Sequence, residues 1–140
     1  MIENIINESI LGLDFGLKKI GIAIKRGKTL SIECLGNFKN SGDVIKKIIE
    51  LVKKEGVNKI VIGRPLGLGG MDTKIGKNID DFIKGLSSSI PKGITLITVN
   101  ENGTTKEAIF RLNQASLDVN KKKDTYSAAI IIERYIRDNV

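Results

Sequence analysis

Three carboxylates stand at positions where a soluble protein rarely leaves an acid without a partner. Asp14 interrupts the apolar run of residues 10–16 between two glycines, Glu101 follows the apolar run of residues 94–99, and Asp124 comes directly after three lysines. Removing an unpaired charge from water costs several kcal/mol or more, so a buried acid usually has a partner. Divalent cations prefer carboxylate oxygens. The three acids therefore indicate a shared metal site.

The composition narrows the chemistry that such a site would carry out. The chain has no histidine, so the most common general base is absent, and its net charge is +7. A strongly basic balance favours a polyanionic partner such as nucleic acid. Two Mg²⁺ or Mn²⁺ ions about 4 Å apart can activate a water and neutralise charge on a phosphodiester. We expect Asp14 to bridge the two ions, with Glu101 and Asp124 each completing the ligands of one ion.

Each of the three acids also has an ordinary structural explanation. Asp14 could accept backbone hydrogen bonds at a strand end, and Glu101 could be a solvated loop residue. Asp124 is well placed to cap the final helix or to lie in its first turn. The other acids are expected at the surface or at helix caps; they include Asp43, Asp72, Asp80, Asp81 and Asp118.

Basic residues close to these acids in the sequence are candidates for binding phosphate. They are Lys18, Lys19, Arg64, Lys121, Lys122 and Lys123. Aromatic residues make up only 4% of the chain, which argues against a platform for stacking bases. Recognition of nucleic acid through its backbone and shape is therefore the better expectation. Solvation of each basic side chain is the alternative.

Length and composition predict one soluble domain over residues 1–140. Apolar residues make up 41% of the chain and charged residues 28%, an ordinary balance for a globular protein. No apolar run approaches the roughly 20 residues that span a bilayer, so no membrane partner is expected. The start of the chain lacks the pattern of a signal peptide, which favours a cytoplasmic protein. The single Cys34 excludes an internal disulfide and an all-cysteine zinc site.

The first forty residues predict three antiparallel strands. Apolar residues gather in the runs 10–16, 19–26 and 29–38, and turn residues separate these runs. Short connections between neighbouring strands imply antiparallel pairing. The same segment therefore places Asp14 on the first strand of a sheet.

Helices and strands alternate over the rest of the chain. Strands are expected at residues 59–63 and 94–99, both short apolar runs. Ser41 or Asp43 can cap a helix that starts at Val44 and stops at Gly56. Further helices are expected from about residue 72 to 86, after Thr104 or Thr105, and from Asp124 to about Arg137, with a basic loop at residues 117–123.

This order predicts an α/β fold with one five-stranded mixed sheet. Three antiparallel strands come first, later parallel strands join beside the first strand through right-handed crossovers, and helices cover both faces. Ligand sites in such sheets gather at the carboxyl ends of the central strands. Asp14 and Glu101 lie close to such ends, and Asp124 could reach the same place from a helix packed on the sheet.

Four segments of the chain resemble the YqgF/RuvX family. They are residues 11–23 around Asp14, the Gly-Arg-Pro-Leu loop of residues 63–66, residues 99–108 around Glu101, and residues 122–132 around Asp124. The family comprises bacterial RNase H-like proteins described as Holliday junction resolvases and as nucleases that mature the small-subunit ribosomal RNA precursor. The resemblance covers nearly the whole chain in the family's order.

The resemblance implies an RNase H-like nuclease domain with a site for Mg²⁺ or Mn²⁺ at Asp14, Glu101 and Asp124. It further implies hydrolysis of phosphodiester bonds in structured nucleic acid, with the 16S rRNA precursor as the expected substrate. The chain departs from the family at Asn100 and Asn102, where an acid and an arginine are usual. Loss of that arginine removes a fixed charge that could bind phosphate or a carboxylate.

Three alternatives stay open at this point. The substrate could be branched DNA, as for a Holliday junction resolvase. The changes at Asn100 and Asn102 also fit a non-catalytic domain that binds nucleic acid or assembling ribosomes. A fragment of the actin-like ATPase fold is disfavoured, because that nucleotide site lies between two domains. Cleavage position, a homodimer, and preference for Mg²⁺ or Mn²⁺ are left open by the sequence.

Overall fold

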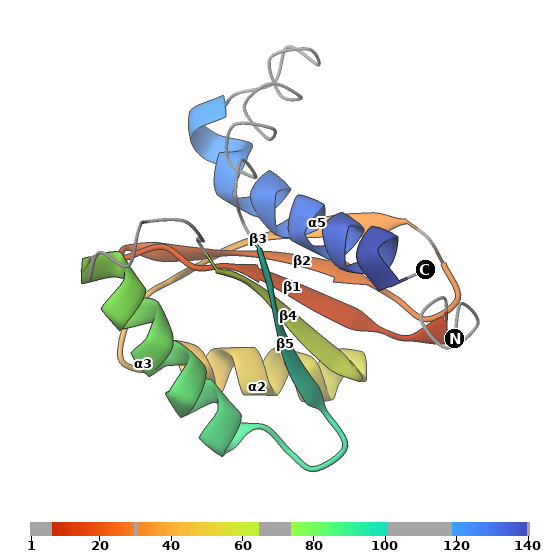
Figure 1. Ribbon diagram of the computed structural model, residues 1–140, viewed down its shortest axis with the longest axis horizontal. Helices are drawn as coiled ribbons and strands as arrows, with labels where there is room; N and C mark the ends of the chain where they lie inside the picture. Colours follow the sequence, from red (N-terminus) through yellow and green to blue (C-terminus); the bar gives the residue numbers. More distant parts are fainter. Residues whose placement is uncertain (1–6, 30, 65–73, 101–118, 140) are drawn as a thin grey trace.

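The computed structural model describes residues 7–29, 31–64, 74–100 and 119–139 of the chain (Figure 1). Side chains are not described for residues 74, 75, 100 and 119–125, which lie at the ends of elements. Glu101 and the helix expected after Thr104 or Thr105 lie outside the described residues. Among the described helices, none is long and apolar enough to cross a membrane.

Five strands form one mixed sheet in the order β3-β2-β1-β4-β5. Their bounds are β1 Ile10–Asp14, β2 Lys19–Lys25, β3 Ile32–Lys39, β4 Lys59–Arg64 and β5 Thr95–Asn100. The strands β1, β2 and β3 pair antiparallel, whereas β4 pairs parallel with both β1 and β5. The expected sheet is therefore confirmed, including the position of the later strands beside the first.

Three strands are shorter than the sequence predicted: β1 and β3 by two residues each, and β2 by one. The first was expected to reach residue 16 but ends at Asp14, because the chain turns at Gly16. A side chain at Gly16 would lie 2.5 Å from the carbonyl oxygen of Lys19, so only glycine fits this turn. The third strand begins at Ile32 rather than at residue 29, since the Thr29 amide donates to the Arg26 carbonyl and extends the preceding turn.

The three described helices are α2 Val44–Glu55, α3 Lys74–Ser89 and α5 Val119–Asn139. As expected, α2 follows Asp43 and stops at Gly56, whose φ of 66° is the left-handed conformation that glycine adopts readily. The expected start of the last helix was wrong: α5 begins at Val119, so Asp124 does not open it. Lysine is a good helix former, and the basic run that was read as a loop lies within α5.

The helices cover opposite faces of the sheet, with α2 and α3 on one face and α5 on the other (Figure 1). Under α2 and α3, the core contains mainly large side chains, among them Leu11, Leu13, Ile20, Ile22, Ile62, Phe82 and Leu86. The core under α5 contains Ile10, Ala23, Val61, Ala128, Ala129, Ile131, Ile132 and Tyr135. The two sets alternate along each central strand, as the two-residue period of a strand requires.

Candidate active site

Asp14 is the last residue of β1 and is only 8% exposed. It shares its face of the strand with Ile10 and Gly12, so its side chain lies on the α5 side of the sheet. The residues opposite it on the two neighbouring strands are both glycines, Gly21 on β2 and Gly63 on β4. Glycine within a strand often marks a place where a ligand or another backbone comes close. The carboxylate is therefore flanked by positions that carry no side chain.

Helix α5 lies against β1 at very close range. A side chain at Gly12 would lie 2.7 Å from the carbonyl oxygen of Ala128 and 2.6 Å from Cγ1 of Ile132. Real Cβ atoms do not approach other atoms so closely, so the helix would have to move if Gly12 had a side chain. The glycine therefore sets the distance between α5 and the strand that carries Asp14.

Contacts at two levels of β1 show that α5 runs in the opposite direction. The Tyr135 hydroxyl lies 2.5 Å from Nζ of Lys59, which pairs with Ile10 at the start of β1. One and two turns earlier, α5 contacts Gly12 through Ile132 and Ala128. Position 124 is one further turn toward the start of the helix, about 16 Å before Tyr135 at 1.5 Å per residue. That length matches the roughly 13 Å from Ile10 to Asp14.

Two of the three predicted metal ligands are not described at the level of side chains. Asp124 belongs to α5, one turn before Ala128, but only its backbone is described. Glu101 is outside the described residues. The preceding residue Asn100 ends β5 and pairs with Arg64, so β5 ends at the same edge of the sheet as β1 and β4. Among the described side chains, no group of three acids, cysteines or histidines could hold a metal. The meeting of the three acids therefore stays a prediction.

The surroundings of Asp14 fit a divalent cation. Oxygen is the preferred ligand of Mg²⁺, which also keeps several waters and so needs space beside its ligand. The glycines at positions 21 and 63 contribute no side chain of their own on either side of the carboxylate. No nitrogen or sulfur ligand accompanies Asp14 on β1, which again suits Mg²⁺ or Mn²⁺.

Two of the predicted phosphate ligands lie in or next to the turn that follows Asp14. Lys18 is exposed, and Lys19 is the partly exposed first residue of β2. Asn40 holds this turn from the end of β3: its Nδ2 donates to the Gly16 carbonyl at 2.8 Å, and its amide donates to the Lys18 carbonyl at 2.8 Å. Asn40 could not be identified from the sequence, because an Asn-Ser-Gly run indicates only a turn.

Arg64 lies at the same edge of the sheet as Asp14 but on the other face. It shares its side of β4 with Ile60 and Ile62, and its guanidinium forms an ion pair with Asp80 of α3. The hydrogen bond with Asp80 raises the pKa of the Arg64 guanidinium, which is charged at neutral pH in any case. The sequence predicts only a surface or capping position for Asp80. Its ion pair with Arg64 could not be predicted, because it depends on α3 lying beside the end of β4.

The opposite end of the sheet carries a separate polar cluster. The Lys59 ammonium donates to Oε1 of Glu8 at 2.9 Å and to the Tyr135 hydroxyl at 2.5 Å. Burial alone would lower the pKa of Lys59, but the hydrogen bonds to Tyr135 and Glu8 outweigh it, and the pKa is raised. At the end of β2, the fully buried Lys25 donates to the carbonyls of Glu8 and Gly27. These contacts fix the amino ends of β1 and β4 and the carboxyl end of β2, at the end of the sheet opposite to Asp14.

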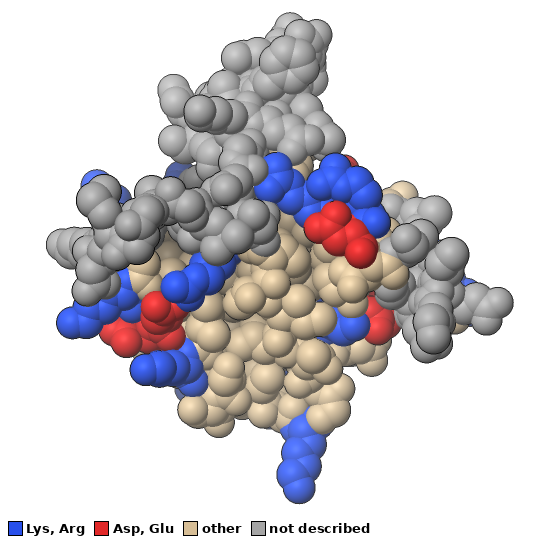
Figure 2. Space-filling model, viewed as in Figure 1, with Lys and Arg blue, Asp and Glu red and all other residues tan. Residues whose placement is uncertain are grey.

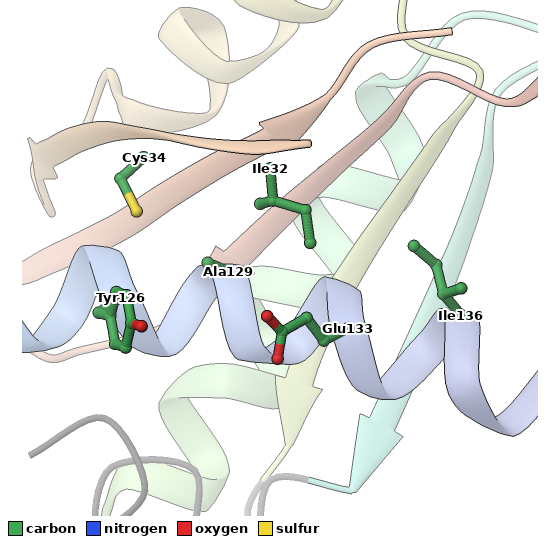
Figure 3. Close-up of a pocket in the computed structure, with 6 residues that line it drawn as sticks. All are labelled: Ile32, Cys34, Tyr126, Ala129, Glu133 and Ile136. Atoms are coloured by element: carbon green, nitrogen blue, oxygen red, sulfur yellow. The ribbon is translucent and has the colours of Figure 1, made fainter. Parts of the chain in front are cut away.

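A groove between β3 and the flank of α5 is a poor candidate for chemistry. Figure 3 shows its lining, which consists of Ile32, Cys34, Tyr126, Ala129, Glu133 and Ile136. Among the described residues that line it, apolar groups dominate and Glu133 is the one carboxylate. Cys34 is exposed, so it is a surface thiol rather than a core residue.

Over β5, the part of the surface that the structure describes shows no basic patch. In the view of Figure 2, lysine and arginine side chains lie around the rim, and the described residues at the centre are uncharged. The strand β5 itself has the uncharged sequence Thr-Leu-Ile-Thr-Val-Asn. The net positive charge is therefore not gathered on this part of the surface.

The sequence as a whole matches a family profile described as "RuvX: Holliday junction resolvase" over residues 8–138. The chain belongs to the RuvX family. The resemblance indicated by the sequence is thus confirmed.

Curated relatives align with this chain over nearly their whole lengths. A protein of Sulfurihydrogenibium sp. (strain YO3AOP1), named "Putative pre-16S rRNA nuclease", is 36% identical over 128 residues, which cover 91% of this chain and 88% of the relative. A protein of Mycoplasmopsis synoviae (strain 53) with the same name is 36% identical over 132 residues, covering 90% of this chain and 95% of the relative.

Solved resolvase structures share the fold of this RuvX protein. Fowlpox virus resolvase, solved with its substrate Holliday junction DNA, aligns with a TM-score of 0.61 and 15% identity over 94% of this chain and 99% of the resolvase. T. thermophilus RuvC in complex with a Holliday junction substrate aligns with a TM-score of 0.55 and 12% identity over 94% of this chain and 95% of RuvC. The fold is therefore the RNase H-like fold that the sequence predicted.

Proposed function

We propose that this RuvX protein is a divalent-metal-dependent nuclease that cleaves the precursor of 16S rRNA. The observation that carries the proposal is the buried carboxylate of Asp14, which lies between two glycines at the carboxyl edge of the sheet. Carboxylate oxygens are ligands that Mg²⁺ prefers, and ligand sites of such sheets gather at the carboxyl ends of the central strands. The substrate follows from the names of the relatives that share over a third of the aligned sequence.

The three acids have separate roles in this proposal. Asp14 would be the central ligand of the divalent metal, because it lies on the central strand and faces α5. Asp124 serves from α5, which Gly12 holds against β1, and Glu101 serves from the segment that follows β5. When bound, the ions supply the activated water and the positive charge that phosphodiester hydrolysis requires.

The basic residues serve to bind and orient the nucleic acid. The turn held by Asn40 presents Lys18 and Lys19 next to Asp14, where they would bind phosphates on either side of the cleaved bond. Lys121, Lys122 and Lys123 precede Asp124 on the first turns of α5 and would contact the same strand. Binding through phosphates requires no base stacking, in keeping with the few aromatic residues.

A second candidate function is cleavage of Holliday junctions. The solved structures that share the fold include two complexes with junction DNA. A non-catalytic binding role is the third, because Asn100 and Asn102 replace an acid and an arginine that are usual in the family. Both candidates would use the same edge of the sheet, so the location of the site does not distinguish them. The substrate that is cut separates the junction resolvase, and the absence of any cut product separates the binding role.

A cleavage assay with two substrates tests the proposal. The full chain would be incubated with a pre-16S rRNA fragment and with a four-way DNA junction, each in Mg²⁺, in Mn²⁺ and in EDTA. We expect cut RNA that depends on the metal, and a loss of at least about a hundredfold in rate for Asp14→Asn, since removing a ligand costs more than removing its hydrogen-bond partner.

The control is Asp138→Asn, which makes the same charge change at an exposed residue near the end of α5. It should cleave as the wild type does. Faster cutting of the junction than of the RNA would favour the second candidate. Binding of RNA without any cut product in either metal would overturn the nuclease proposal and favour a binding role.

A further inference from the structure

Arg64 and Asp80 form an ion pair at the edge of the sheet that holds Asp14. Arg64 is the last residue of β4, and its strand neighbour Gly63 pairs with Asp14. Both Nη atoms of Arg64 face the two carboxylate oxygens of Asp80, with Nη2 at 3.4 Å from Oδ2. The side chain of Arg64 is 40% exposed and that of Asp80 is 46% exposed. Solvent therefore reaches both partners.

The fork of an arginine binds a carboxylate and a phosphate in the same way. Both anions offer two oxygens in the spacing of the two Nη groups. An exposed ion pair contributes little to stability, so an anion from outside can compete for it at small cost. A phosphodiester that reaches this edge would meet a guanidinium that extends from the end of β4 and is charged at every working pH.

We propose that Asp80 occupies the phosphate-binding fork of Arg64 in the free protein, and that a phosphate of the nucleic acid displaces it on binding. The inference rests on the proposed function and adds Asp80 as a residue that sets affinity for the substrate. Asp80 acts through Arg64 and is a positioning residue, not a catalytic one.

The face of the sheet decides which phosphate Arg64 binds. Asp14 faces α5, whereas Arg64 shares the α3 side of β4 with Ile60 and Ile62. The phosphate at Arg64 is therefore a flanking one, on the other side of the edge from the phosphate that is cleaved. Changes at Asp80 should alter KM and Kd for the nucleic acid and leave kcat unchanged.

A purely structural role for the pair predicts a different result. Removing a contact that only holds α3 to β4 would lower stability and could not raise affinity for nucleic acid. Asp81 supplies the matched control, because it is the next residue on α3, is exposed, and forms no ion pair with the described part of the chain. Asp80→Asn and Asp81→Asn change the net charge equally.

The test measures binding of a fluorescently labelled pre-16S rRNA fragment by anisotropy, with Ca²⁺ in place of Mg²⁺ to prevent cleavage. At low salt, where screening is weak, we expect Asp80→Asn to lower Kd about threefold to fivefold relative to Asp81→Asn. The gain should disappear in an Arg64→Gln background, where Asp80→Asn and Asp81→Asn should bind alike. Single-turnover cleavage in Mg²⁺ at saturating protein should show the same rate for Asp80→Asn and Asp81→Asn.

Three outcomes would overturn the inference, and they differ in what else they affect. Equal Kd values for Asp80→Asn and Asp81→Asn would remove Asp80 from substrate binding while leaving the nuclease intact. A gain that persists with Arg64→Gln would show that Asp80 acts through charge alone. No binding of RNA by the wild type would overturn the inference together with the proposed function.

Discussion

The face of the sheet beneath α2 and α3 is packed with large aliphatic and aromatic side chains, whereas the face beneath α5 has glycine and alanine at its closest contacts. On the first face, Phe15 and Phe82 lie 5.1 Å apart between ring centroids, and leucines and isoleucines fill the remaining space. On the second, the backbone of α5 approaches Gly12 directly. Side chains can change rotamer to absorb a small insertion, but a backbone carbonyl cannot.

This difference is the reason to propose the site on the α5 face. Two elements that touch through their backbones keep a fixed distance from each other. Residues close to the contact, one turn along α5 from Ala128 and two residues along β1 from Gly12, therefore also keep a fixed distance. Asp14 follows Gly12 by two residues, and Asp124 precedes Ala128 by one turn. The α2 and α3 face buries most of the large apolar side chains, whereas the contact on the α5 face fixes the distance between α5 and β1.

The largest effect is expected from Gly12→Ala. The added methyl would overlap the Ala128 carbonyl oxygen and the Ile132 side chain, so α5 must shift. We expect a loss of about 2–3 kcal/mol in the free energy of unfolding and a loss of cleavage activity. Urea denaturation and the RNA cleavage assay measure the two effects.

Gly42→Ala is the control for this change, since a side chain there meets no atom within 4 Å. It should leave both quantities almost unchanged. If Gly12→Ala were as stable and as active as the wild type, the contact at Gly12 would not hold α5 in place. The proposed difference in rigidity between the two faces would then be wrong.

A smaller effect is expected from Tyr135→Phe, which tests the far end of α5. The change removes the hydroxyl that accepts a hydrogen bond from the partly buried Lys59. We expect a loss of about 1 kcal/mol, because Glu8 and solvent still satisfy the ammonium. Thermal or urea unfolding of the two proteins measures this loss.

The same variant carries a test of pH dependence. The pKa of Lys59 is raised above its ordinary value of 10.5, so the stabilisation from its charged form is complete below pH 10.5 and is lost as the pH rises through the folded value. The cost of Tyr135→Phe should therefore be equal at pH 6 and pH 8. A cost that differs between these two values would contradict the assignment of a charged, hydrogen-bonded Lys59.

The smallest effect is expected from Gly85→Ala on the opposite face. The added methyl would lie 2.8 Å from Cδ1 of Ile45, the flexible end of a side chain that can rotate away. Replacing glycine within a helix by alanine favours the helix by up to about 1 kcal/mol. We expect stability to be unchanged or slightly raised, measured in the same urea experiment. A loss as large as that of Gly12→Ala would show that the two faces are equally rigid.

Much of the fold could be predicted because it depends on local patterns. Alternation of apolar residues predicted β2, helical spacing after residue 44 predicted α2, and the need for positive φ predicted its end at Gly56. The start of α5 could not be predicted in this way. Its first turns are polar and basic, and such a composition is compatible with a loop or with an exposed helix.

The candidate site divides in the same manner. A lone acid in an apolar strand indicated Asp14 without any knowledge of its neighbours, since burial of a charge is costly in every fold. Which residues flank it depended on strand register: Gly21 and Gly63 come from different strands and meet Asp14 only in the sheet. The approach of Glu101 and Asp124 to Asp14 stays a prediction.

By itself, the sequence determined the order of strands and helices, the buried acid and the excess of positive charge, because these follow from residue types and short spacings. Only the tertiary structure decided that α5 touches β1 at Gly12, that Asn40 holds the turn with the two lysines, and that Asp80 pairs with Arg64. Each of these contacts joins residues far apart in the chain or on different elements. Their partners are selected by packing and register, which no local pattern encodes.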